Sequence, residues 1–188
     1  MNIIAISEIG RAIGELKSGG IIDYPTDTVI GRGCNLWNYN SVKRIYQMKG
    51  KDFNEPLSFA CSSIEEINAY TEISFREIDK IKQLLKSGSH YTFILKAKIK
   101  HPSINLIARN KKIGIRIIDH PTVKMLTKYA GPIITTSANF HNEKAPKSID
   151  ELTKSEFAKS ADLTISGKCY YGKPSIVYDL IDDRIIRE

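Results

Sequence analysis

The chain has 188 residues, 41% hydrophobic and 26% charged, which is long enough for one folded domain, 1–188, and argues against a disordered protein. The apolar start at 1–6 is too short for a secretory signal, and no apolar run approaches the roughly 18 residues of a membrane span, so we expect a cytoplasmic protein. The net charge of +7 favours a polyanionic partner, either nucleotide phosphates or RNA, and does not choose between them.

The first half of the chain alternates apolar segments of strand length with segments of helical periodicity. Val42, Ile45 and Tyr46 form an apolar stripe at helical spacing, and Ser41 can cap that helix at its N-terminus. The patterns predict, in chain order, a buried strand, a helix, a strand and two further helices at 21–24, 41–48, 57–61, 64–69 and 74–85.

The second half begins with two segments rich in β-branched and aromatic residues, which favour strands. Pro121 stands where a proline at the first helical position would start a helix, and Ser148 can cap another. We expect strands at 91–95, 112–117, 133–136, 163–166 and 175–180, and helices at 121–128 and 148–154. Strands interleaved with helices indicate one α/β or α+β domain around a central sheet.

The most informative segment is 24–34, where the first strand ends and short polar side chains follow. Thr26, Asp27 and Thr28 come at the C-terminal end of that strand, where open α/β sheets bind small polar ligands. The two glycines that bracket Arg32 would let the backbone approach such a ligand closely. A tight turn, whose Thr and Asp side chains satisfy backbone groups, is the alternative interpretation.

Two lysines, Lys49 and Lys51, follow the predicted helix at 41–48 and are separated by one glycine. Lysine side chains are flexible point charges, so this pair at a helix C-terminus can reach adjacent phosphates. A solvated helix end explains the same pattern, because the helix dipole also favours lysine there.

Further polar residues stand in two of the later strands. Ser137 and Asn139 belong to a group of hydrogen-bonding side chains after the strand at 133–136, which suits a polar ligand in the crevice of the sheet. Arg116 lies in the strand at 112–117 and can pair with a ligand carboxylate through its fork of donors. The alternative interpretation of Ser137 and Asn139 is a cap-and-turn role, and that of Arg116 is an arginine on the protein surface.

Two other patterns predict no site. Residues 167–173 fit GxxxxGK, but Pro174 replaces the Ser or Thr of a P-loop, and a strand follows where a P-loop needs a helix. The three cysteines form no CxxC pair and the four histidines have no HxxxH spacing, so we expect idle thiols and no protein-bound metal.

Taken in order, these segments resemble the YrdC/TsaC/YciO family of threonylcarbamoyl-AMP synthases and their relatives. The matching pieces extend over nearly the whole chain and lie at 24–28, 49–51, 56–57, 91–95, 114–116, 137–139, 172–179 and 186–187. The short form of the family lacks a second domain, and this chain is similar to that form, with some features of the YciO branch.

The resemblance implies an open twisted α/β sheet, mixed in strand direction and flanked by helices, with a basic concave cleft. It also implies a reaction: the amine of L-threonine captures CO2 from bicarbonate, and the carbamate attacks the α-phosphorus of ATP and releases pyrophosphate. Such chemistry relies on positioning and charge neutralisation rather than on a nucleophilic side chain. The product, threonylcarbamoyl-AMP, serves tRNA modification, for which the chain would need partner proteins.

The resemblance also implies roles for individual residues. Thr26, Arg116 and Ser175 would bind threonine, with Arg116 on its carboxylate. Lys49 and Lys51 would be the catalytic residues that neutralise the phosphates. The nucleotide would also contact Asn54, Ser137, Asn139 and Arg187. Mg²⁺ would arrive bound to the ATP phosphates, and no tightly bound organic cofactor is expected.

The chain departs from the family pattern near the expected phosphate site. Family synthases usually have an arginine where this chain has Lys51, which keeps the charge but loses the bidentate fork. Asp52 replaces a proline, and Glu55 replaces an asparagine, for which the preceding Asn54 could substitute. These changes place negative charge beside the phosphates.

Other departures lie elsewhere in the motifs. Ala60 stands where a histidine is common, the usual Glu-Ser-Thr is replaced at 174–176, and the Pro-Gly-Pro before Thr92 is replaced by Ser, Gly and His residues within 87–91. Two hypotheses therefore stand beside the synthase. One is a non-catalytic protein that binds double-stranded RNA or tRNA on a basic face. The other is a YciO-like relative that binds or hydrolyses adenylates.

Overall fold

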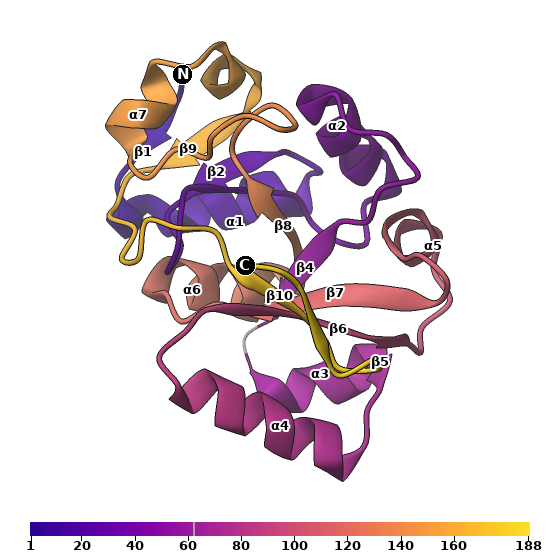
Figure 1. Ribbon diagram of the computed structural model, residues 1–188. Helices are drawn as coiled ribbons and strands as arrows, with labels where there is room; N and C mark the ends of the chain where they lie inside the picture. The colour runs from indigo at the N-terminus through magenta and orange to yellow at the C-terminus, as the bar shows by residue number, and fades with distance from the viewer. Residues whose placement is uncertain (62) are drawn as a thin grey trace.

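The centre of the molecule is one mixed, eleven-stranded sheet, described in this computed structural model over residues 1–61 and 63–188 (Figure 1). The strands are β1 Ile3–Ile4, β2 Ile22–Tyr24, β3 Gly31–Gly33, β4 Ser58–Cys61, β5 Thr71–Glu72, β6 Tyr91–Ala97, β7 Lys112–Ile117, β8 Ile133–Ser137, β9 Leu163–Ile165, β10 Ile176–Asp179 and β11 Arg184–Arg187. Ten follow the order β1-β9-β2-β3-β8-β4-β7-β6-β10-β11, and β5 pairs with β6.

Helices flank this sheet. They are α1 Ile9–Lys17, α2 Tyr39–Lys49, α3 Ile64–Tyr70, α4 Phe75–Lys86, α5 Pro102–Ile107, α6 Pro121–Ala130 and α7 Ile149–Thr153, with 3-10 turns η1 Ile6–Glu8 and η2 Glu156–Ser160. In Figure 1, α3 and α4 lie at the lower end of the molecule and α7 at the opposite end. Within the described residues, no helix combines the length and apolar character that crossing a membrane would require.

Successive side chains of a strand point to opposite faces of the sheet, so the hydrophobic core is divided between the two faces. Phe59 and Ile134 pack in the larger cluster, which contains residues of α2, α3, α4 and α5. Their neighbours Ala60 and Ile133 pack on the other face, against residues of α1 and α6. The expected α/β fold, a mixed sheet flanked by helices, is confirmed, whereas the basic concave cleft stays a prediction.

Most predicted elements lie within two residues of the observed bounds. One capping prediction is wrong: Asn38, not Ser41, caps α2, because its side chain accepts a hydrogen bond from the Ser41 N–H at 3.1 Å. Ser41 lies inside the first turn, and its hydroxyl donates to the carbonyl of Gly19 at 2.6 Å. The sequence patterns do not predict the helices α1 and α5 or the short strands β1, β3, β5 and β11.

The glycines that bracket Arg32 have a different role from the one expected. Both lie in β3 and face protein atoms: a Cβ on Gly33 would lie 2.1 Å from the carbonyl oxygen of Ile134, and one on Gly31 would lie 3.0 Å from Cγ2 of Thr26. They allow close packing inside the protein, so the expectation that they open the backbone to a ligand is wrong.

Strand register brings the polar segments to neighbouring positions. Tyr24 at the end of β2 pairs with Gly31, which pairs on its other side with Ser137 at the end of β8. β4 lies between β8 and β7, and its Ala60 pairs with Arg116. The segment after β2, the end of β8 and the middle of β7 therefore belong to one contiguous part of the sheet.

Candidate functional site

Arg116 is a buried cation in the middle of β7, with 7% of its surface exposed. Its neighbours Ile115 and Ile117 pack in the larger cluster, so its side chain lies on the opposite face of the sheet. There Nη2 donates to a carboxylate oxygen of Asp27 and to the Thr28 hydroxyl at 2.6 Å. Nε has no acceptor among the described residues. Burial lowers the pKa of Arg116 and Asp27 opposes that effect, but a guanidinium stays charged in proteins.

The hydroxyl of Thr26 is engaged within its own loop. It donates to the carbonyl of Val29 at 2.7 Å, accepts from the Thr28 N–H at 3.0 Å, and lies 3.0 Å from the Thr28 hydroxyl. Thr26 is fully buried. It therefore orders the loop that carries Asp27 and Thr28 to Arg116.

Asp27 uses both carboxylate oxygens. Oδ1 faces Arg116, and Oδ2 lies 2.8 Å from Nδ1 of His90, the residue just before β6. Asp27 is 3% exposed, whereas the His90 side chain is 23% exposed. A buried carboxylate thus joins a buried guanidinium to a half-buried imidazole.

Ser175 connects this group to the C-terminal strands. Its hydroxyl is 2.8 Å from that of Thr92, and both residues are buried. Its carbonyl accepts a hydrogen bond from Nη2 of Arg187 at 3.0 Å. The Arg187 charge also acts on Arg116. We call Thr26, Asp27, His90, Arg116, Ser175 and Arg187 the arginine cluster.

Lys49, the last residue of α2, is also buried, with 4% of its surface exposed. Its ammonium donates to the backbone carbonyls of Ser137 at 2.8 Å and Asn139 at 2.7 Å, and lies 3.5 Å from the Asn139 side-chain oxygen. Its own carbonyl accepts from the His141 N–H at 2.8 Å. Lys49, Ser137 and Asn139 form the lysine cluster, which joins three predicted site residues.

Burial, together with the charges of Lys51 and Arg32, lowers the pKa of Lys49 to about 7, while the charge of Asp23 opposes them. The ammonium is held by neutral carbonyls and not by a carboxylate. Its charge is therefore poorly compensated inside the protein, which is the physical condition for binding an anion.

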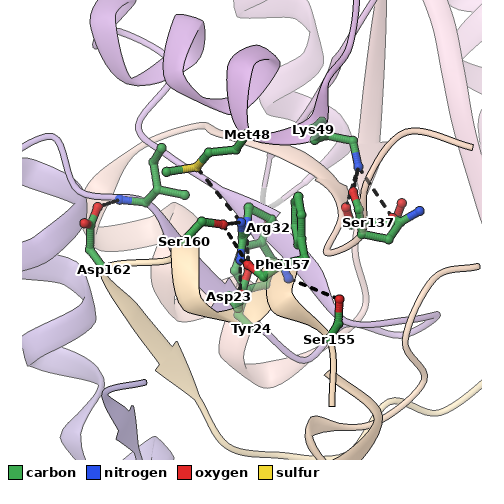
Figure 2. Close-up of polar contacts among 12 residues, drawn as sticks. Asp23, Tyr24, Arg32, Met48, Lys49, Ser137, Ser155, Phe157, Ser160 and Asp162 are labelled. Carbon is green, nitrogen blue, oxygen red and sulfur yellow. Dashed lines mark hydrogen bonds and ion pairs between the residues drawn. The ribbon is translucent and has the colours of Figure 1, made fainter. Parts of the chain in front are cut away.

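A fully buried ion pair lies beneath Lys49, and the sequence analysis did not identify it (Figure 2). Arg32 donates to both carboxylate oxygens of Asp23 at 2.7 Å and to the carbonyl of Phe157 at 2.9 Å. The guanidinium carbon is 3.8 Å from the centre of the Phe157 ring, and Nζ of Lys49 is 5.5 Å from the same centre. Phe157 therefore contacts both cations.

Lys51 follows Lys49 after Gly50, and its ammonium has a different partner. Gly50 ends α2 in the left-handed conformation, with φ 62°, which favours glycine. Nζ of Lys51 is 2.8 Å from Glu55, and Glu55 also lies 3.2 Å from Nε2 of His141. The hydrogen bond from Lys51 is the main cause of the lowered pKa of Glu55. Glu55, the acidic replacement expected near the phosphates, is thus a direct partner of Lys51.

Among the described residues, neither Asn54 nor Arg187 forms a hydrogen bond or ion pair with the lysine cluster. The side chain of Asn54 is exposed, and its backbone contacts Asp52 and Arg109. Arg187, expected on the nucleotide, contacts Ser175 of the arginine cluster. Sequence reasoning singled out the segment that contains Asp27 and Arg32 but missed their partners, which are His90 and Arg116 for Asp27 and Asp23 for Arg32.

Two hollows lie elsewhere in the described part of the chain. One, of about 150 Å³, adjoins the lysine cluster and is lined by residues that include Ala138, Asn139, Lys144 and Glu151. The other, of about 880 Å³, lies between α4 and the chain after β10. Among the described residues, no group of three or more His, Cys, Asp or Glu is arranged to hold a metal ion.

Comparison with known proteins assigns this chain to a family. The model of the Sua5_yciO_yrdC family, described as "Telomere recombination", matches residues 15–188. A putative threonylcarbamoyl-AMP synthase of Methanocaldococcus jannaschii is 36% identical over 175 residues, which cover 92% of this chain and 80% of that protein. The uncharacterized protein YciO of Escherichia coli K12 is 30% identical over 188 residues, covering 96% of this chain and 88% of that protein.

A solved structure supports the same assignment. The crystal structure of P. abyssi Sua5 complexed with L-threonine superposes with a TM-score of 0.83 at 25% identity and covers 96% of this chain. The match covers 55% of the P. abyssi protein, so this chain corresponds to about half of that protein's length.

Proposed function

This chain belongs to the Sua5/YciO/YrdC family, and on that premise we propose that it is a threonylcarbamoyl-AMP synthase. It joins L-threonine, bicarbonate and ATP into threonylcarbamoyl-AMP and pyrophosphate, a reaction of the nucleotidyltransferase type. The product supplies the threonylcarbamoyl group for tRNA modification, and transfer to tRNA is carried out with partner proteins.

The observation that carries the proposal is the buried guanidinium of Arg116, whose Nε has no acceptor among the described residues. A buried unpaired donor is costly, so an acceptor from a ligand would stabilise it. A carboxylate is the acceptor that best matches a guanidinium. L-threonine, the ligand in the P. abyssi Sua5 structure, supplies such a carboxylate. Thr26 and Ser175 belong to the same cluster, and we expect both to contribute to the threonine site.

The lysine cluster binds the nucleotide. Lys49 carries a poorly compensated charge, and Lys51 lies beside it at the end of α2. Ser137 and Asn139 both contact Lys49, and Asn139 also lines the 150 Å³ hollow. The two lysines neutralise the charge that develops on the phosphates when the carbamate attacks, which is the main requirement of phosphoryl transfer.

Mg²⁺ enters with ATP and is not held by a protein cage. The carboxylates near Lys49 are already engaged, because Asp23 pairs with Arg32 and Glu55 pairs with Lys51. This donor set fits a metal coordinated mainly by phosphate oxygens.

The proposal is tested by measuring pyrophosphate release from Mg-ATP with purified protein, with and without L-threonine and bicarbonate. Release that requires both co-substrates, with threonylcarbamoyl-AMP identified by mass spectrometry, is the expected result. Folded protein that releases no pyrophosphate under these conditions overturns it.

A second candidate, adenylate binding or hydrolysis of the YciO-like kind, is favoured by one observation: Glu55 already neutralises Lys51. That pairing reduces the positive charge available to a triphosphate. AMP formed from ATP or from an acyl-adenylate without any need for threonine would support this candidate in place of the synthase.

A further inference from the structure

His90 is a fixed but accessible side chain that the proposed reaction has not yet used. It directly precedes β6, and its carbonyl accepts a hydrogen bond from the Ile176 N–H of β10 at 2.8 Å. Its ring centre lies 4.9 Å from that of Tyr171. The backbone and one side of the ring are therefore held in place, while 23% of the side chain stays exposed.

Asp27 determines which ring nitrogen of His90 carries a proton. Asp27 forms an ion pair with Arg116, and the carboxylate of an ion pair only accepts hydrogen bonds. Nδ1, 2.8 Å from Oδ2 of Asp27, must therefore be the donor. A neutral His90 then has its lone pair on Nε2, for which the described residues supply no hydrogen-bond partner.

The proposed reaction needs a base near the arginine cluster. An amino-acid amine carries a proton at neutral pH and must lose it before it can attack CO2. Arg116 cannot accept a proton, both oxygens of Asp27 are occupied, and the ammonium of Lys49 is buried against two carbonyls. A threonine whose carboxylate contacts Arg116 carries its amine on the adjacent carbon, and Asp27 joins His90 to the same guanidinium.

We propose that Nε2 of His90, oriented by Asp27, accepts the proton that the threonine ammonium loses. This role rests on the proposed synthase function. The ammonium passes one proton to Nε2, its nitrogen lone pair forms the N–C bond to CO2 derived from bicarbonate, and the ionised Asp27 offsets the charge of the imidazolium. Ammonium and bicarbonate together yield carbamate, water and one proton, which His90 later returns to solvent. General-base catalysis of this kind contributes about 10²–10⁴-fold to a rate.

The test compares His90→Ala, His90→Asn and His90→Gln in threonine- and bicarbonate-dependent pyrophosphate release. Asparagine can keep the hydrogen bond to Asp27 but lacks an equivalent of Nε2. We expect kcat to fall about a hundredfold or more in the Ala and Asn variants, with the threonine dissociation constant changed less than threefold. Added imidazole should restore part of the rate in His90→Ala and have no effect on the wild type.

His101→Asn is the matched control. His101 caps α5 by accepting from the Ser103 N–H at 3.2 Å, and asparagine caps helices as well. This variant should keep the wild-type rate. Two results would overturn the role of His90 and leave the proposed function intact. One is a wild-type rate in His90→Asn, and the other is a loss of rate in folded His90→Ala that added imidazole does not restore. Absence of turnover in the wild type overturns the proposed function, and the role of His90 with it.

Discussion

The arginine and lysine clusters each contain a buried cation, and the two cations are stabilised by different partners. Arg116 is paired with the carboxylate of Asp27, whereas Lys49 is held by the neutral carbonyls of Ser137 and Asn139. The guanidinium keeps its charge at every pH that the protein experiences. The ammonium, with a pKa of about 7, does not. The charge of Arg116 in the arginine cluster is therefore fixed, whereas the charge of Lys49 in the lysine cluster changes with pH near neutrality.

Removal of the guanidinium should have the largest effect on the fold. Arg116→Ala leaves Asp27 buried without its ion-pair partner, so we expect the free energy of unfolding to fall by about 3–5 kcal/mol. Denaturant unfolding measures this loss. The double variant Arg116→Ala with Asp27→Asn should recover much of it, because the remaining buried group is neutral; no recovery would mean that the ion pair is not the cause.

Arg116→Lys keeps a charge and tests the binding role. The Michaelis constant for threonine should rise far more than that for ATP, since lysine lacks the bidentate fork. Steady-state kinetics of pyrophosphate release with each substrate varied in turn will measure both constants. Equal increases would contradict the assignment of Arg116 to the threonine carboxylate.

Lys49→Met should abolish nucleotide-dependent turnover and change how stability depends on pH. The ordinary pKa of 10.5 falls to about 7 in the folded chain, so between these values the unfolded chain binds a proton that the folded chain does not. Stability of the wild type relative to Lys49→Met should therefore increase as pH rises through this window, by at most about 1.4 kcal/mol per pH unit.

Urea unfolding of both proteins at several pH values measures this difference, and other titrating groups cancel in the comparison. A difference that stays constant across this window would mean that Lys49 keeps its proton in the folded chain. Unchanged turnover in folded Lys49→Met would remove phosphate neutralisation by this residue from the mechanism.

The smallest effect is expected at the edge of the lysine cluster. Glu55→Gln frees Lys51 from its partner at 2.8 Å, so ATP should bind up to about fivefold more tightly at low salt, and the gain should shrink at high salt. Glu72→Gln, which removes the carboxylate of the exposed Lys96 pair, is the matched control. Weaker ATP binding in Glu55→Gln would show that Glu55 assists the nucleotide.

Sequence periodicity predicted the strand ends that carry the site. The polar residues after β2, the arginine in β7 and the segment that ends β8 occupy one contiguous part of the sheet, as the pattern of strand ends suggested. The fold was predictable because hydrophobic alternation and proline positions act locally.

The partners of the charged groups were not predictable in this way. Asp27 meets Arg116 from 89 positions away and His90 from 63 positions away, so no local pattern contains either pair. The sequence predicted that both lysines are flexible charges that reach phosphates, with a solvated helix end as the alternative. Lys49 is buried instead, and its ammonium donates to the carbonyls of Ser137 and Asn139, which are distant in the sequence.

The strand order carries a consequence for protein synthesis. β9 joins β2 in one half of the sheet and β10 joins β6 in the other, so the chain between them crosses from one half to the other. Ser175 and Arg187 lie on or after this crossing. A nascent chain can form the sheet interior around β2, β8 and β7 long before translation supplies these residues. If both residues bind substrate as proposed, we expect substrate binding only after the last strands have emerged from the ribosome, so unfinished chains would be inactive.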